Sequence, residues 1–251
     1  MLPQVRRIGQ HAAVRAHIRQ EQLGDHLDGR LGAGWRYDVD LPGRRIIFSG
    51  AQGQVTGRAQ LLASVASSPS SLLWGWSQVF ASQAGPDPAA AAFHRFGREH
   101  NLSELVTEEA PYEVPAGLSQ ADVIATICHD VGAAATVVFG PEVLYYTLPT
   151  GNGAGRIVLL VDQLSAPLPP LTLTDAFVKL PRLLQEVDEV AWSLDGLARF
   201  TPGWSLEPGD IVERTHHYTL LDENGAWAGI SVTFHPDGRV EQVSLQGVHQ
   251  P

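Results

Sequence analysis

The sequence contains a single cysteine, Cys128, among its 251 residues. One cysteine cannot form a disulfide within the chain, and it cannot build a zinc site from several thiolates. The sequence also lacks an uninterrupted apolar run of about 18 residues, which a membrane-spanning helix requires. Its first residues lack the apolar core of a signal peptide. We therefore expect a cytoplasmic protein without a membrane-spanning segment.

Basic residues are also scarce. The chain has 17 Lys and Arg against 27 Asp and Glu, which gives a formal net charge of −10 and an isoelectric point of about 5.4. Proteins that bind nucleic acids usually carry a basic face, and an anionic membrane repels an acidic protein. The charge balance therefore predicts no nucleic-acid partner and no membrane partner, whereas it is compatible with a protein partner.

Motifs for catalysis or cofactor binding are few. His94 and His100 are six residues apart in HRFGREH, whereas the zinc motif H-E-x-x-H aligns two ligands at i and i+4. The segment GNGAGR at 151–156 resembles a phosphate loop, but a predicted strand follows it instead of a helix with free N–H groups. Cys-His-Asp at 128–130 is consecutive on a predicted helix, where neighbours do not face each other. We expect no metal and no cofactor.

The sequence does contain clear helix and strand patterns. Apolar residues recur at helical spacing near the N-terminus, and alternating segments separated by turn residues follow. A later helix begins after Ser119, a good N-cap, and Gly132 is a candidate C-cap. The predicted elements up to residue 162 are a helix at 5–23, strands at 34–41, 45–50, 57–67 and 71–78, helices at 85–101 and 118–132, and strands at 135–140, 143–149 and 155–162.

A proline-rich stretch, LSAPLPPLTLT at 164–174, is the clearest change of composition. Its prolines favour a stiff extended linker. A second series follows it, with a helix at 174–188 and strands at 189–194, 210–222, 226–235 and 238–247. Helices combined with successive antiparallel strands predict the α+β class. We expect two modules, 1–163 and 170–251, each made of helix plus an antiparallel meander sheet.

The stretch SLLWGWSQ at 71–78 holds two tryptophans separated by one glycine. In a strand, alternation would place Trp74 and Trp76 on one face and Gly75 on the other. Two interpretations remain open. The indoles can anchor the sheet beneath the following helix, since each buries on the order of 200 Å², with Gly75 allowing a close backbone approach. Alternatively, they form an aromatic wall for a flat or cationic ligand.

The same region resembles a family of bacterial proteins of unknown function. That family is marked by a strand of the form W-L-W-x-W-x-N, which follows an L-x-G-S/T strand and precedes an Ala-rich helix. Here LWGWSQ at 73–78 matches two of the tryptophans, with leucine at the first position and glutamine at the asparagine position. The resemblance covers about residues 1–160. It implies no catalytic residue, and it does not extend to the last 85 or so residues.

The richest polar segment lies near the C-terminus, in ERTHHYT at 213–219. In a continuous strand, Glu213 and His217 would share one face, and His235 could join them from a neighbouring strand. Histidines beside a carboxylate can perform acid–base chemistry or bind a metal. The exposed face of an antiparallel sheet would also carry such residues without any site.

Two hypotheses for function follow. The first is a non-catalytic binding or interaction protein, with a protein partner favoured by the acidic composition. The alternative is an enzyme or small-molecule binder with a pocket beside the C-terminal sheet, formed by Trp76, Glu213, His217 and His235. The distinguishing observation is whether these four side chains converge on one enclosed cavity.

Overall fold

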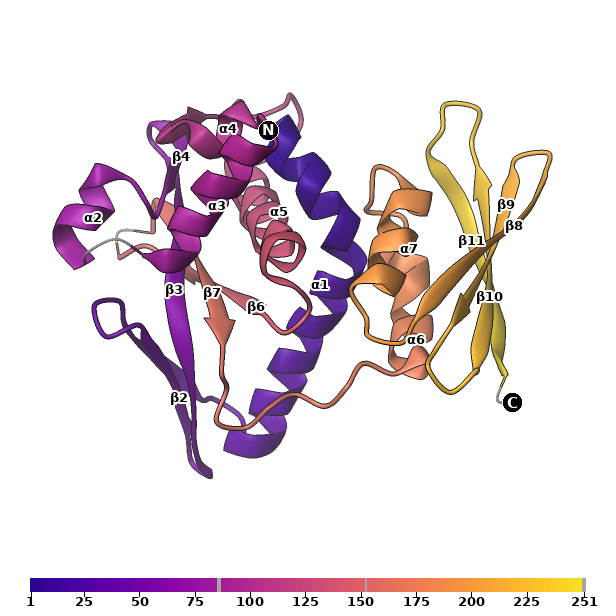
Figure 1. The fold of residues 1–251 in the computed structure, drawn as a ribbon, viewed down its shortest axis with the longest axis horizontal. Helices are drawn as coiled ribbons and strands as arrows, with labels where there is room; N and C mark the ends of the chain where they lie inside the picture. Colours follow the sequence, from indigo (N-terminus) through magenta and orange to yellow (C-terminus); the bar gives the residue numbers. More distant parts are fainter. Residues whose placement is uncertain (85–86, 152, 250–251) are drawn as a thin grey trace. The chain divides into compact units, whose positions relative to one another are not determined.

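The structure is a computed structural model that describes residues 1–84, 87–151 and 153–249 (Figure 1). It consists of helices and two antiparallel sheets, which confirms the predicted α+β class. The contacts divide the chain into two compact units. The first unit comprises Met1–Gly9 and Gln20–Leu168, and the second comprises Gln10–Arg19 and Pro169–Pro251. The predicted module boundaries are not tested by this division and stay a prediction.

The elements of the first unit follow the predicted order, with some differences at their ends. They are the two ends of α1 (Pro3–Leu31), then β1 (Arg36–Asp40), β2 (Arg45–Gly50), β3 (Gly53–Ser67), β4 (Ser70–Trp74), α2 (Gln78–Ala84), α3 (Pro88–Glu99), α4 (Ser103–Val106), β5 (Glu109–Pro111), α5 (Gln120–Phe139), β6 (Leu144–Pro149) and β7 (Gly155–Asp162). Residues 85 and 86 of one predicted helix, and residue 152 of the GNGAGR loop, lie outside the described residues.

The long strand β3 organises the sheet of the first unit. Its first part pairs with β2 and its last part with β4, while β7 pairs with it and with β6. Strands β6 and β7 are consecutive and pair antiparallel, so they form a hairpin, as the sequence context of GNGAGR predicts. Leu61 lies between the part of β3 that pairs with β2 and the part that pairs with β4, and its N–H donates a hydrogen bond to the Asp87 carboxylate at 2.9 Å. The other oxygen of this carboxylate accepts from the Ala89 N–H at 3.0 Å and so caps α3.

Helix α5 corrects two predictions. Ser119 is its N-cap as expected, but the helix continues to Phe139. Gly132 is therefore not a C-cap, and residues 135–139 of the predicted strand at 135–140 are helical. At Gly132 a Cβ atom would overlap the ring of Tyr145 on β6. The glycine permits close packing of helix on strand, and a local sequence pattern cannot distinguish this use from a helix end.

Helix α5 is also long and apolar enough to cross a membrane, judged by length and composition alone. However, 61% of its apolar window is buried inside the fold. Its buried residues pack against the sheet strands β3, β6 and β7. Such burial is typical of a core helix in a globular protein.

The second unit adds the middle of α1 to two helices and a sheet of order β11-β10-β9-β8. Its elements are α6 (Leu173–Leu183), α7 (Val190–Arg199), β8 (Ser205–Val212), β9 (Thr215–Leu221), β10 (Trp227–Phe234) and β11 (Val240–His249). Helices α6 and α7 lie on one side of this sheet (Figure 1). Val14 and Ile18 of α1 join its hydrophobic core.

The predicted strand at 189–194 is wrong, because this segment begins helix α7. Val190, Leu194 and Leu197 are buried at the helical spacing i, i+4 and i+7. Packing of this stripe outweighs the strand preference of valine and tryptophan. The predicted continuous strand at 210–222 is also wrong, because a turn at residues 213 and 214 divides this segment into the end of β8 and strand β9. Strand β8 itself starts at Ser205. It contains Pro208 and Gly209, which disfavour strands but are tolerated at a sheet edge.

Candidate functional site

Trp74 is a core residue. Its side chain is fully buried, its ring lies 5.6 Å from that of Phe93, and its Nε1–H donates to the Glu104 carbonyl at 2.7 Å. The prediction that Trp76 shares its strand face is wrong, because β4 ends at Trp74 and residues 75–76 form a turn. Gly75 does allow the expected close approach. A Cβ atom there would overlap the Leu61 carbonyl and touch Ala90 of α3.

Trp76 occupies a different environment. It is half-buried, and its ring lies 4.4 Å from that of His94 on α3, with the planes tilted by 40°. Its Nε1 atom is buried and has no hydrogen-bond partner among the described residues. The two tryptophans therefore have different environments: Trp74 belongs to the core, whereas Trp76 lies beside an exposed helical surface.

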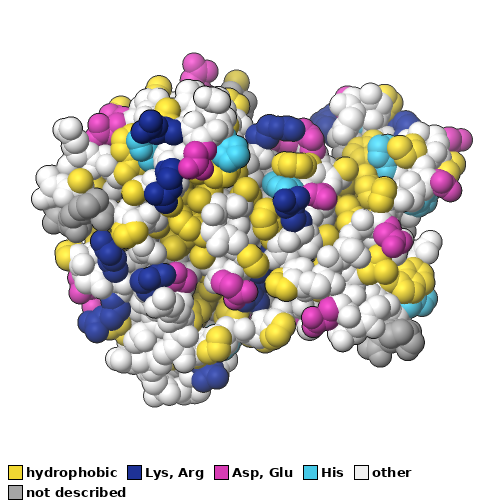
Figure 2. Space-filling view, viewed as in Figure 1, with side chains coloured by type: hydrophobic (Ala, Val, Ile, Leu, Met, Phe, Trp, Pro, Cys, Tyr) yellow, Lys and Arg dark blue, Asp and Glu magenta, His cyan; other side chains and the backbone are white. Residues whose placement is uncertain are grey.

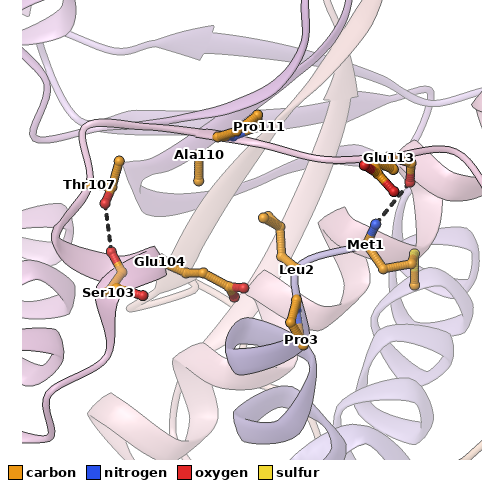
Figure 3. Close-up of a pocket in the computed structure, with 9 residues that line it drawn as sticks. All are labelled: Met1, Leu2, Pro3, Ser103, Glu104, Thr107, Ala110, Pro111 and Glu113. Atoms are coloured by element: carbon orange, nitrogen blue, oxygen red, sulfur yellow. Dashed lines mark hydrogen bonds between the residues drawn. The ribbon is translucent and has the colours of Figure 1, made fainter.

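A pocket of about 360 Å³ opens beside the start of α1 (Figure 3). Leu2 and Pro3 line one side, and Ala110 and Pro111 line another. The Glu104 side chain from α4 extends toward Leu2 and Pro3 in the close-up (Figure 3). The sequence gives no motif that would indicate this pocket.

The Glu104 carboxylate binds backbone N–H groups at the start of α1. Its Oε2 accepts hydrogen bonds from the N–H groups of Gln4 and Val5, both at 2.9 Å. In return the Gln4 side chain accepts from the Glu104 N–H at 3.1 Å. Burial raises the pKa of Glu104 above its ordinary 4.5, although the two backbone hydrogen bonds act in the opposite direction. Glu104 therefore acts as a helix cap supplied from another element.

The Cys-His-Asp segment on α5 contains no assembled nucleophile. Burial raises the pKa of Cys128 to about 12, which keeps the thiol protonated and unreactive. The His129 Nδ1 atom lies 2.7 Å from the Tyr145 hydroxyl, and Asp130 forms an ion pair with Arg6 at 3.4 Å. His129 and Asp130 thus have separate partners and Cys128 is buried, so the three side chains do not act on one another, as their helical spacing predicts.

The site residues predicted near the C-terminus each lie in a different environment. Glu213 does not belong to the strand face, because it lies in the β8–β9 turn with a φ of 54°. His217 lies on β9, and its Nδ1 is 2.8 Å from the Ser231 hydroxyl of β10. His235 follows β10, and its Nδ1 is 3.9 Å from the Glu241 carboxylate.

A rung of the sheet separates the two histidines. Thr215 and Thr233 are cross-strand partners whose hydroxyl oxygens are 2.9 Å apart, and they lie between His217 and His235 along the strands. His217 is the cross-strand partner of Ser231, which is four residues before His235. Four strand residues span roughly 13 Å, so the two histidines do not meet. Among the residues that the structure describes, no three His, Cys, Asp or Glu side chains gather as a metal site.

The polar side of the C-terminal sheet forms a continuous surface, which we call the outer face. Along β9 and β10, Tyr218, Leu220, Ala228, Ile230 and Val232 are buried, whereas the residues between them are half-buried or exposed. The cross-strand register assigns the outer face Thr215, His217 and Thr219 of β9, Gly229, Ser231 and Thr233 of β10, and Gln242, Ser244 and Gln246 of β11.

An aromatic pair closes one end of the outer face. Trp227 of β10 is 36% exposed and stacks on its cross-strand partner His249, with ring centroids 4.1 Å apart. The acidic Glu207 of β8 borders the face opposite Thr219. The sequence analysis identified the histidines of this sheet but missed Trp227. Only the pair Trp74 and Trp76 stood out in the sequence, because the stacking of Trp227 on His249 depends on the fold.

The fold defines an α+β protein in which the central strand β3 of one sheet is buried on both faces over residues 59–63, whereas the other sheet has a polar outer face. A family model described as "Family of unknown function (DUF6882)" matches residues 6–164, so the chain belongs to this family. The match confirms the resemblance to a family of unknown function in the N-terminal part of the sequence. Neither the curated proteins nor the solved structures contain a match to the chain.

Proposed function

We propose that the protein is a non-catalytic, cytoplasmic binding protein and that a protein partner docks on the outer face of its C-terminal sheet. The composition of this face supports the proposal. Its central residues are threonine, serine, glutamine and histidine, in a chain whose residues are 18% charged. The cores of protein interfaces are depleted in charged residues, since each charge must be desolvated on binding.

Trp227 supplies an anchor for such a partner. Tryptophan is among the residues that contribute most to binding energy at interfaces. Stacking on His249 holds the indole in one orientation before binding, which lowers the entropy lost when the partner docks. The partner surface is expected to be uncharged and to offer an apolar contact for this ring.

The alternative enzyme hypothesis receives less support from the geometry. Its C-terminal candidates have separate partners: His217 contacts Ser231, and His235 lies near Glu241. Glu213 is in a turn. The fourth candidate, Trp76, belongs to the first unit.

Site-specific photo-crosslinking in the native host tests the proposal. A benzophenone amino acid replaces Ser244 on the outer face, and a control replaces Val178, which is 73% exposed on α6. We expect one discrete adduct from position 244 and none from position 178. Adding Trp227→Ala or Thr219→Glu should reduce that adduct at least fivefold. Equal adducts at both positions, or an adduct unaffected by both substitutions, would contradict the proposed docking face.

A further inference from the structure

The exposed side of α3 has a feature that the proposed function does not use. A hollow of about 450 Å³ is lined by His94, Arg95, Arg98 and Glu99, all from the HRFGREH segment. Residues three and four apart are neighbours on a helix surface, so His94, Arg95 and Arg98 form one patch. Lys and Arg side chains gather over α3 and the strands near it on the face shown in Figure 2.

The two arginines of this patch form no ion pair with the residues that the structure describes. Both are exposed, and neither guanidinium forms a hydrogen bond or ion pair with another residue in the described part of the chain. Arg58, in contrast, binds the Asp162 carboxylate through two nitrogens. Two adjacent unpaired guanidiniums are notable in a chain with 27 acidic and 17 basic residues.

His94 is held in place beside the arginines. Its ring packs against Trp76 at a centroid distance of 4.4 Å, and this contact limits the freedom of the imidazole. The patch therefore combines a positioned imidazole with two flexible guanidiniums around a hollow. Guanidinium groups present parallel N–H donors that match the oxygens of phosphate groups.

We propose that His94, Arg95 and Arg98 bind the phosphate group of a small phosphorylated molecule. The hollow has the size of a small-molecule site, which ranges from roughly 300 to 1,000 Å³. A nucleic acid or an anionic membrane fits less well, because the net charge of −10 repels an extended polyanion. A compact ligand interacts mainly with charges within about 8 Å at physiological salt, where the local basic patch dominates.

Glu99 restricts which phosphorylated molecules can bind. It lines the same hollow, and its negative charge disfavours a second anionic group there. The site should therefore prefer a monophosphate ester with a neutral remainder over a polyphosphate or a tricarboxylate. Neutral hydroxyl groups of the ligand can donate to the Glu99 carboxylate.

Titration of the full chain with glycerol phosphate, at constant ionic strength, tests this proposal. Binding is followed by calorimetry and by the NMR signal of the His94 ring, with pyrophosphate, citrate and a single-stranded oligonucleotide as competing probes. We expect saturable glycerol phosphate binding that is at least tenfold weaker in the Arg95→Gln/Arg98→Gln double variant. The Arg36→Gln/Arg45→Gln variant, which removes two exposed charges from β1 and β2, should bind like the wild type.

Arg98 also lies in the last turn of α3, where a basic side chain stabilises the helix dipole. The melting temperature of each variant therefore accompanies the titration, and Glu99→Gln serves as a variant that should bind pyrophosphate more tightly. Three results would overturn the proposal. They are the absence of saturable binding, equal weakening in both double variants, or tighter binding of citrate or the oligonucleotide than of glycerol phosphate.

Discussion

The two sheets share antiparallel pairing but bury their strands differently. In β3, all residues from 59 to 63 are buried, so both faces of this strand are covered. In β10, burial alternates from one residue to the next. A strand that is covered on both faces serves the core alone, whereas a half-covered strand leaves one face free for binding. In the first unit, a candidate binding surface lies on helix α3 rather than on the sheet.

Replacing Trp74 should have the largest effect on stability. Trp74→Ala removes a fully buried indole and the hydrogen bond to Glu104, so we expect a loss of about 3–5 kcal/mol in the free energy of unfolding. Trp76→Ala should cost less, about 1–2 kcal/mol, because this ring is only half-buried. Urea denaturation measures both. Equal losses would mean that the two tryptophans serve the core alike.

Neighbouring residues on one strand sharpen the contrast between the sheets. On β3, Leu61→Ala and Leu62→Ala should each cost about 2–5 kcal/mol, because both side chains are buried. On β9, Leu220→Ala should cost as much, whereas Thr219→Ala should cost no more than about 1 kcal/mol. A large loss for Thr219→Ala in denaturant melts would show that the outer face is part of a core.

Gly75→Ala is expected to destabilise the first unit by about 1–3 kcal/mol, because the added methyl group meets Leu61 and Ala90. Gly24→Ala is the matched control. Gly24 lies inside α1 with open space around its Cα, so alanine should stabilise the helix by about 0.5–1 kcal/mol. Thermal melts of the two variants should therefore shift in opposite directions. A shift in the same direction would refute the close approach at Gly75.

The smallest expected effect is a pH dependence from Glu104. Its pKa is raised in the folded protein, so the folded state binds the proton more tightly than the unfolded state does. Its stabilising contribution is therefore full below about pH 4.5 and is lost as the pH rises through the raised pKa. Glu104→Gln should remove this part of the pH dependence. Unfolding free energies that differ from wild type by the same amount at pH 4 and pH 7 would contradict it.

The sequence predicts the class of fold and most elements of the first unit, because strong alternation and capping signals mark them. Ser119 illustrates this, since its capping role depends only on neighbouring residues. The predictions for Gly132 and for the α7 segment were wrong, because the conformation there depends on residues distant in sequence. These are Tyr145 for Gly132 and the core of the second unit for α7.

The candidate sites were harder to predict for the same reason. Glu213 was assigned to a strand face, but the chain turns there. Glu104 and Trp227 gained their roles from residues far away in sequence, namely Gln4 and His249. The basic residues of α3 stand in HRFGREH, a segment that the sequence analysis considered only as a zinc motif. Only the fold shows that Arg95 and Arg98 form no ion pair within the described residues.

The middle of α1 has a consequence for synthesis on the ribosome. Val14 and Ile18 pack in a core whose other members run from Leu171 to Val232, so their partners are translated more than about 150 residues after them. Until Leu171 and the residues after it are made, this apolar stripe lacks the partners of its core. Exposed apolar surface of this kind favours aggregation and attracts chaperones. The nascent chain therefore carries a helix whose central stripe stays uncovered until residues 171–232 have been translated.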